Sequence, residues 1–328
     1  MKAAPPPITH TTRLAWSNLW ATGVVDTFGH GDAEGGPQPP LAHEWRRWLS
    51  RLPPNTRVLD LGTGNGALPR LLLQSCSDPS VHCDGVDVAD ARPHWLDRLP
   101  PRERERVRIH SGVSCEELPF PSASFGCVVS QFGIEYANLD QALPEALRVL
   151  QPGGLLRFAI HHVDGRPAQL AREELAHSKW LMDSGWLPAA REMALAMSLM
   201  GSPAGRQALN AEPQWQAVRQ TFDGLHRLLT ERASRSPCPD LLMDAQNWLV
   251  QVFQASARQG EDAARAGMDQ ITELLGQGQL RLQDLLNHVI DSPGIERLAR
   301  LARETGRNAK VEQAEDSGHL MGWWLTAT

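Results

Sequence analysis

The sequence predicts a doubly wound α/β domain that carries a large helical insertion, and three observations support this fold class. Between residues 57 and 161, short apolar runs alternate with helical stretches, which is typical of a parallel sheet with helices on both faces. Glycines directly follow the first run, at the position where α/β sheets bind ligands. Strand-like composition returns in residues 310–314 and 320–326, so we interpret the preceding helical stretch as an insertion within the domain.

The segment before the first strand predicts two helices joined by a flexible link. Residues 1–7 hold three consecutive prolines and are expected to form a disordered tail. Trp16 and Trp20 stand at helical spacing and predict the first helix. Residues 29–40 are rich in Gly and Pro, which predicts the link, and residues 41–52 have the amphipathic pattern of a second helix.

Five strands are predicted before the insertion, with helices between them. The expected strands cover residues 58–61, 81–88, 107–110, 125–130 and 155–161. The expected helices cover residues 67–74, 92–99 and 140–150. We therefore divide the chain into an N-terminal tail with cover helices (1–52), a ligand-binding core (53–164), a helical insertion or lid (165–308) and the final two strands of the core sheet (309–328).

Composition narrows the classes of protein and partner. Lys plus Arg total 32 against 38 Asp plus Glu, a net charge of −6, so no bulk positive field attracts nucleic acid. No run reaches the roughly 18 apolar residues of a membrane span, and the N-terminus lacks the apolar core of a secretory signal. We therefore expect a soluble, cytoplasmic protein with no nucleic-acid or membrane partner. The cysteines include no C-x-x-C pair, which predicts reduced thiols and no metal site.

The glycine-rich turn after the first strand predicts the ligand site. Residues 60–66 read Asp-Leu-Gly-Thr-Gly-Asn-Gly, and the glycines leave room for a flat ligand against the backbone. A nicotinamide dinucleotide is the alternative ligand, but its fingerprint needs glycine at position 67, where Ala67 is only sometimes tolerated. The carboxylate of Asp60 would repel a pyrophosphate, whereas it suits a ligand with an ammonium group and no phosphate. S-adenosylmethionine is such a ligand.

This turn resembles the first motif of class I S-adenosylmethionine-dependent methyltransferases, and later segments agree in order and spacing. Residues 85–88 resemble the end of the family's second strand, whose acid accepts hydrogen bonds from the ribose hydroxyls. Residues 116–125 and 148–154 resemble the branch that includes ubiquinone and menaquinone biosynthesis methyltransferases. The resemblance covers about residues 41–162 and the last two strands. It implies a Rossmann-like, seven-stranded methyltransferase sheet, with the helical insertion between strands 5 and 6.

The resemblance also implies a set of cofactor-binding residues. They are Asp60, Gly62, Thr63, Gly64, Asn65, Gly66, Asp87, Val88, Ser114, Cys115 and Gln131. The chain departs from its branch at residues 113–116, where Val-Ser-Cys-Glu replaces Gly-Asp-Ala-Glu, so Ser114 or a backbone group must bind the adenine amino group. Structural alternatives stay open: a helix-start acid at Asp60, a surface-turn aspartate at Asp87, and plain loop residues at Ser114 and Cys115.

The acceptor side follows the fourth and fifth strands. Residues 130–136 occupy the place between cofactor and substrate in this fold, and they lack the Pro-Pro-Tyr motif of enzymes that methylate adenine or glutamine amides. Glu135 is a candidate to orient or deprotonate the acceptor, with a helix-start carboxylate as the alternative. His161 and His162 end the fifth strand and point to opposite faces, so at most one faces the site. That histidine is a candidate catalytic base, with a structural histidine as the alternative.

The predicted reaction is direct displacement of the sulfonium methyl group, which leaves S-adenosylhomocysteine. We expect Trp16, Trp20 and Tyr136 to contact the substrate, and the helix of the two tryptophans together with the insertion to cover it. The expected substrate is a small, partly apolar metabolite that is methylated on oxygen, nitrogen or carbon. The alternatives are a protein or RNA methyltransferase and a non-catalytic cofactor-binding partner subunit. The size of the helical block allows a homodimer.

Overall fold

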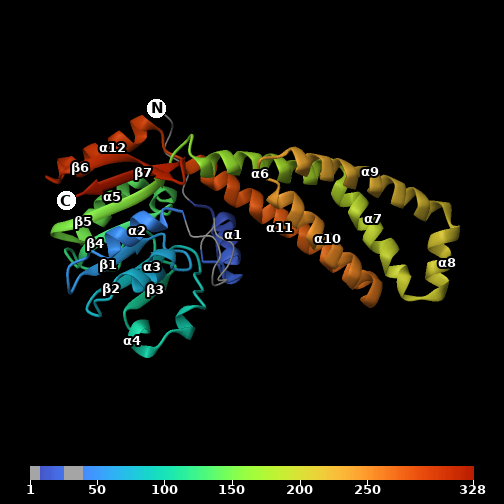
Figure 1. The fold of residues 1–328 in the computed structure, drawn as a ribbon, viewed down its shortest axis with the longest axis horizontal. Helices are drawn as coiled ribbons and strands as arrows, with labels where there is room; N and C mark the ends of the chain where they lie inside the picture. Colours follow the sequence, from blue (N-terminus) through green and yellow to red (C-terminus); the bar gives the residue numbers. More distant parts are fainter. Residues whose placement is uncertain (1–7, 26–39) are drawn as a thin grey trace. The chain divides into compact units, whose positions relative to one another are not determined.

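A seven-stranded mixed sheet carries the α/β part of the chain (Figure 1). The computed structural model describes residues 8–25 and 40–328, so the predicted tail and the predicted link, apart from Pro40, lie outside the described residues. The strands are β1 (Arg57–Leu61), β2 (His82–Asp87), β3 (Val107–Ser111), β4 (Phe125–Gln131), β5 (Leu150–His161), β6 (Ala309–Asp316) and β7 (His319–Ala327). Their order is β3-β2-β1-β4-β5-β7-β6, and β7 runs antiparallel to β5 and β6. The predicted sheet and its two returning strands are confirmed.

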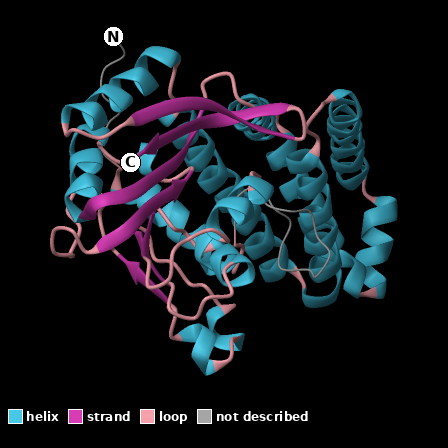
Figure 2. Cartoon of the chain, turned by 60° about the vertical axis from the view of Figure 1, so that its left-hand side comes forward, coloured by secondary structure: helices cyan, strands magenta, loops and turns pink. Residues whose placement is uncertain are grey.

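The central parallel strands bury both of their faces, which explains why they read as continuous apolar runs. In β1 every residue after the first is buried. The helices α2 (Ala42–Leu49) and α3 (Ala67–Ser75) pack on one face of the sheet. The helices α5 (Leu139–Val149) and α12 (Ser292–Glu304) pack on the other. Figure 2 shows helices on both sides of the strands. The first predicted helix is present as α1 (His10–Ala21).

The predicted helix over residues 92–99 is wrong. The segment contains only a 3₁₀ turn, η1 (Leu96–Arg98), and the short helix α4 (Pro101–Arg104) follows it. Pro93 lacks an N–H and disfavours a helical conformation at the residue before it. Trp95 is buried, and its Nε1 donates at 2.7 Å to a backbone carbonyl of the glycine turn. The segment therefore packs against that turn instead of forming a helix on the sheet.

The helical insertion is present, but its compact part is shorter than predicted. Its helices are α6 (Arg166–Asp183), α7 (Trp186–Ser198), α8 (Pro203–Ala211), α9 (Pro213–Arg235), α10 (Asp240–Gln259) and α11 (Glu261–His288), with a 3₁₀ turn η3 (Leu199–Gly201). The chain forms an α/β unit of the described residues up to Gln169 plus Asp284–Thr328, and a helical unit of Leu170–Gln283. The prediction placed α12 in the insertion. It belongs to the α/β unit because its buried side chains share a core with β5 and β7.

The chain leaves the sheet after β5 and returns beside the same point. Ile290 N donates to His161 O at 2.9 Å, and Val163 N donates to Ile290 O at 3.1 Å. His162 and Ile290 thereby form a parallel bridge at the end of β5. The two ends of the insertion are therefore hydrogen-bonded to each other.

The helical unit has its own apolar core and a buried polar cluster. Arg232 Nε donates to His177 Nδ1 at 2.8 Å, and His177 Nε2 lies 2.8 Å from Ser236 Oγ. Because a guanidinium only donates, His177 is neutral with its hydrogen on Nε2. Burial and the charge of Arg232 lower the pKa of His177 accordingly. Among the described helices, none is both long and apolar enough to cross a membrane.

The guanidinium group of Arg157 on β5 packs against tryptophan rings of α2 and β7. The guanidinium carbon of Arg157 on β5 lies 3.9 Å from the ring centroid of Trp324, 5.7 Å from that of Trp45 and 5.9 Å from that of Trp48. Arg157→Ala removes this stacking and the packing of the arginine stem, so the free energy of unfolding should fall by about 1–2 kcal/mol in urea denaturation. Arg47→Ala, at an exposed position on α2, should change it by less than about 0.5 kcal/mol. Equal losses in the two variants would contradict the prediction.

Candidate functional site

The glycine turn after β1 depends on glycine at two positions. Gly62 has a φ of +66°, and a Cβ there would lie 2.7 Å from Gly133 Cα. Gly64 has a φ of +52°, and a Cβ there would lie 2.7 Å from the ring of Trp20. Both positions therefore combine a left-handed conformation with close contacts that only glycine permits.

Asp60 lies buried beneath this turn. Its Oδ2 accepts a hydrogen bond from Thr63 Oγ1 at 2.6 Å. Burial raises the pKa of Asp60 to about 7, with a smaller contribution from the charge of Asp87 and in opposition to the Thr63 hydrogen bond. The group is therefore balanced between its neutral and charged forms near neutral pH, and a cation beside it would favour the carboxylate.

Asp87, at the end of β2, shapes the turn as well as lining a cavity. Its Oδ2 accepts Gly64 N at 2.8 Å, and its Oδ1 accepts Ala89 N at 2.8 Å. Burial raises the pKa of Asp87 to about 6, although these two hydrogen bonds lower it. Because a carboxylate has about four acceptor positions, Asp87 can accept further hydrogen bonds from a ligand.

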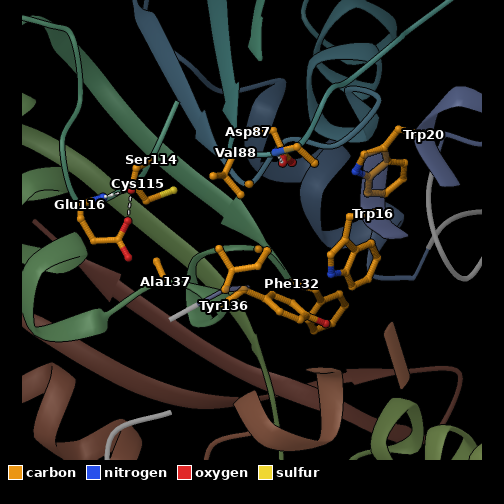
Figure 3. A pocket seen from close by; sticks show the side chains of 14 residues that line it. Trp16, Trp20, Asp87, Val88, Ser114, Cys115, Glu116, Phe132, Tyr136 and Ala137 are labelled. Atoms are coloured by element: carbon orange, nitrogen blue, oxygen red, sulfur yellow. Dashed lines mark hydrogen bonds between the residues drawn. The ribbon is translucent and has the colours of Figure 1, made fainter. Parts of the chain in front are cut away.

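Two adjoining cavities lie beside the glycine turn. The first, the Asp87 cavity, is lined by Asp87, Val88, Ala89, Ser114, Cys115 and Glu116 among others. The second, the Asp60 cavity, is lined by Asp60, Thr63, Gly64, Gln131 and His161 among others. Both are lined by Trp16, Trp20, Gly62, Phe132 and Tyr136. Because these five residues line both cavities, we treat the two as one site. Figure 3 shows the Asp87 cavity with Ser114 and Trp16 on opposite sides of it.

Aromatic rings form the wall that the two cavities share. The rings of Trp16 and Trp20, both from α1, are stacked with centroids 5.9 Å apart. Trp16 also meets Tyr136 edge-on, with centroids 5.6 Å apart. Tyr136 belongs to the 3₁₀ turn η2 (Ile134–Tyr136), which follows β4. The three residues predicted as substrate contacts are therefore brought together.

Two residues assigned to cofactor binding do not line either cavity in the described part of the chain. Asn65 Nδ2 donates to Trp20 O at 2.8 Å and to Val24 O at 2.7 Å, and its Oδ1 accepts Arg92 N at 2.7 Å. Gly66, with a φ of +79°, begins α3. The assignment is corrected on this point: the side chain of Asn65 is fully used in holding α1 over the turn, and Gly66 is needed for the turn to enter the helix.

Ser114 and Cys115 line the Asp87 cavity, where the sequence places the adenine end of the ligand. Ser114 Oγ donates to the carboxylate of Glu116, and Glu116 N donates to Ser114 Oγ at 3.2 Å. Burial raises the pKa of the Cys115 thiol, which therefore stays protonated. As a protonated thiol Cys115 is a weak nucleophile, and it lines the cavity as a small apolar side chain.

Glu135 and His161 form a pair, but only His161 reaches the cavity. His161 lines the Asp60 cavity, and its ring stacks on Phe132 with centroids 4.2 Å apart. Glu135 is fully buried, with Oε1 accepting His161 N at 2.9 Å and lying 2.8 Å from His161 Nδ1. Glu135 lines neither cavity in the described part of the chain, so the prediction that it acts directly on the acceptor is corrected: its Oε1 contacts His161 instead.

His162 points to the other face of β5, as strand geometry requires. Its Nδ1 accepts Asp164 N at 2.8 Å, and its ring packs on Trp323 with centroids 4.4 Å apart. It does not line either cavity in the described part of the chain. As a candidate catalytic residue His162 is therefore set aside in favour of His161.

Sequence reasoning missed three residues at this site. Phe132 lines both cavities from a left-handed backbone conformation, with a φ of +54°, which nothing in its sequence context indicates. Asp284 accepts Trp16 Nε1 at 2.8 Å, and the ring of His288 packs on Tyr136 with centroids 5.2 Å apart. Asp284 and His288 lie in a long helix, where an Asp and a His four residues apart look like ordinary surface positions.

Comparison with known proteins places the glycine turn and Asp87 in a recognised domain. Residues 58–154 match the family model of a methyltransferase domain. The ubiquinone/menaquinone biosynthesis C-methyltransferase UbiE of Legionella pneumophila subsp. pneumophila is 37% identical over 125 residues, which are 35% of this chain and 48% of that protein. A malonyl-[acyl-carrier protein] O-methyltransferase of Halorhodospira halophila is 33% identical over 142 residues, which are 40% of this chain and 47% of that protein.

The family model and the two relatives match only part of the chain. The chain spans about half the length of the curated relatives it matches, and the domain match ends before His161. Among solved structures, the geranyl diphosphate C-methyltransferase of Streptomyces coelicolor A3(2) is 17% identical, with a TM-score of 0.38, and covers 52% of this chain and 73% of that chain. A score this low carries no argument about function.

Proposed function

We propose that this chain, which contains a class I S-adenosylmethionine-dependent methyltransferase domain, transfers a methyl group to an oxygen, nitrogen or carbon nucleophile of a small, partly apolar metabolite. One observation carries the proposal. The Asp87 cavity, with its acid and glycines, adjoins the Asp60 cavity, with its histidine, and aromatic rings wall both.

The residues at the site fit S-adenosylmethionine. Asp87 would accept hydrogen bonds from the ribose hydroxyls, since its carboxylate faces the cavity with acceptor positions to spare. Ser114 and Cys115 would border the adenine. Gly62 and Gly64 would let the methionine part lie against the backbone, beside the carboxyl group of Asp60.

The chain's own residues would then hold the acceptor and receive its proton. When bound, S-adenosylmethionine supplies an electrophilic methyl group on a positively charged sulfur. Trp16, Trp20 and Tyr136 would exclude water and align the acceptor, and such positioning contributes about 7–11 kcal/mol in favourable cases. His161 would take the acceptor's proton, and Glu135 would stabilise the resulting imidazolium.

The lining of the two cavities disfavours an anionic acceptor. No Lys or Arg is among the described residues that line them, so nothing there would pair with a phosphate. Aromatic walls suit a flat or partly apolar molecule. The two curated relatives are a C- and an O-methyltransferase, and the proposal therefore leaves the methylated atom open. A homodimer, a cytoplasmic location and a covering role for the helical insertion stay predictions.

Calorimetry with adenosyl ligands tests the proposal. S-adenosylmethionine and S-adenosylhomocysteine should bind, and NAD should not. Because a bound cation favours the ionised form of Asp60, affinity for S-adenosylmethionine should rise with pH through about 7, by at most about tenfold per pH unit, and then level off. Asp60→Asn should flatten this profile.

The transfer itself is tested with a methyl-labelled cofactor and a panel of phenols, amines and acids. Label in a small product supports the proposal. Label in protein or RNA would favour a macromolecular acceptor, and adenosyl binding with no transfer to any acceptor would favour a non-catalytic subunit. Binding of NAD but of neither adenosyl ligand would refute the cofactor assignment.

A further inference from the structure

The last turn of α11 brings two buried titratable side chains against the aromatic wall. Asp284 and His288 belong to the α/β unit and stand four residues apart. Asp284 Oδ1 lies 3.2 Å from His288 Nδ1, and Asp284 Oδ2 accepts Trp16 Nε1 at 2.8 Å. One carboxylate therefore bridges a histidine and the tryptophan of α1.

The same residues close a ring of contacts through Tyr136. The His288 ring packs on Tyr136 with centroids 5.2 Å apart, and Tyr136 meets Trp16 edge-on at 5.6 Å. Trp16 then returns to Asp284 through its indole N–H. Since Trp16 and Tyr136 line both cavities, this ring fixes the shape of the shared wall.

The Nδ1 side of the His288 ring faces Asp284. His288 Nδ1 lies 2.8 Å from Asp284 O, and because a carbonyl only accepts, Nδ1 carries a hydrogen. Its Nε2 is buried without a hydrogen-bond partner in the described part of the chain. The groups that face His288 are Asp284 on its own helix and Glu135 and Tyr136 on η2, with His161 on β5 beyond the tyrosine.

The balance of these surroundings favours the protonated form of His288. Burial alone would lower the pKa of His288, but the hydrogen bonds and charge of Asp284 and the charge of Glu135 raise it above its usual value. Loss of the proton would break the pairing of His288 with the buried carboxylate of Asp284, and breaking a buried ion pair is costly.

We propose that Asp284 and His288 are positioning residues that hold Trp16 in place over both cavities, so that the pair determines how tightly the adenosyl ligand binds. The role rests on the proposed function, because it concerns the ligand that function requires. Asp284 and His288 do not line either cavity in the described part of the chain, so they act through Trp16 and Tyr136.

The test combines binding with a spectroscopic readout that needs no ligand. Asp284→Ala should weaken S-adenosylhomocysteine binding about tenfold, and Trp16→Phe, which removes only the indole N–H donor and part of the ring, should weaken it by a similar factor. If Asp284 acts through Trp16, the double variant should bind no more weakly than Asp284→Ala. Glu273→Gln, an exposed acid on the same helix, should bind as the wild type does.

The indole ¹⁵N–¹H resonance of Trp16, assigned by its loss in Trp16→Phe, should shift with pH as His288 titrates. It should lose that titration in His288→Gln. Asp60 is present in both proteins, so its contribution cancels in the ratio of wild-type affinity to His288→Gln affinity. This ratio should be largest at low pH and should shrink as His288 deprotonates. The Trp16 resonance and the affinity ratio both report on positioning. Thermal melting of each variant shows separately whether the protein still folds.

Two binding results would overturn the inference. One is unchanged ligand affinity in Asp284→Ala, and the other is a double variant in which the two single losses multiply. A wild-type protein that binds no adenosyl ligand would instead refute the proposed function, and the positioning role with it. A Trp16 resonance that does not respond to pH would contradict the positioning role alone.

Discussion

Replacing His161 with glutamine is expected to lower kcat by about 10²–10⁴-fold, the usual contribution of a positioned base, and to change affinity for S-adenosylhomocysteine by less than about threefold. His161 is the histidine that lines the Asp60 cavity, and Glu135 Oε1 lies 2.8 Å from its Nδ1. Glutamine keeps a polar side chain of similar length but cannot take up a proton. The measurement is steady-state kinetics with the acceptor that the transfer assay identifies.

The neighbouring histidine is the matched control. His162→Gln changes the same residue type at the position directly after β5, where the ring packs against Trp323. Its kcat should stay within about threefold of wild type, because His162 touches neither cavity in the described part of the chain. Equal losses of kcat in the two variants would indicate a structural effect on the strand and would contradict the assignment of His161 as the base.

Glu135→Gln tests whether Glu135 acts on His161 through its negative charge or only by orienting the residue. The amide oxygen can still accept His161 N, which the carboxylate accepts at 2.9 Å, but the negative charge beside Nδ1 is gone. We expect a loss in kcat between those of the wild type and His161→Gln.

Replacing Asp87 with alanine is expected to weaken binding of S-adenosylhomocysteine by about 100-fold or more. The carboxylate accepts Gly64 N and Ala89 N, so without it the glycine turn is held less firmly and the ligand must order the turn as it binds. Loss of the hydrogen bonds to the ribose adds to this. Asp87→Asn keeps one acceptor oxygen and should lose about tenfold. Calorimetry measures both, alongside thermal melting to check that the variants fold.

Asp90 provides the control for Asp87. It lies three residues further along, its side chain is exposed, and Asp90→Ala should leave affinity within about twofold. Binding by folded Asp87→Ala at wild-type strength would mean that the carboxylate shapes the turn without touching the ligand.

The sequence predicts well those site residues whose positions follow from short-range patterns, such as motif spacing, helical periodicity and strand alternation. Gly62 and Gly64 adopt the left-handed conformation that favours glycine in a tight turn, and Asp87 ends the strand that pairs with β1, so the motif spacing places all three. Trp16 and Trp20 follow from helical periodicity. His161 and His162 follow from strand alternation, which predicts that one faces the cavity without saying which.

The parts that the sequence does not predict depend on contacts between distant segments. Asn65 looks like a ligand contact, and only the fold reveals that α1 returns to use its amide. Glu135 looks like a free acid until β5 places His161 beside it. The helix α12 has the composition of the insertion, and its assignment to the α/β unit depends on which core its apolar face enters.

The bridge between His162 and Ile290 bears on how such a chain can change over evolutionary time. When the two ends of an inserted segment are hydrogen-bonded to each other, the segment does not strain the domain that carries it, and its length has little effect on that domain. Blocks of different length or content can therefore be exchanged at this junction while the strands keep their register. The bond from Ile290 N to His161 O fixes the junction on the α/β side, so such an exchange leaves the end of β5 where it is.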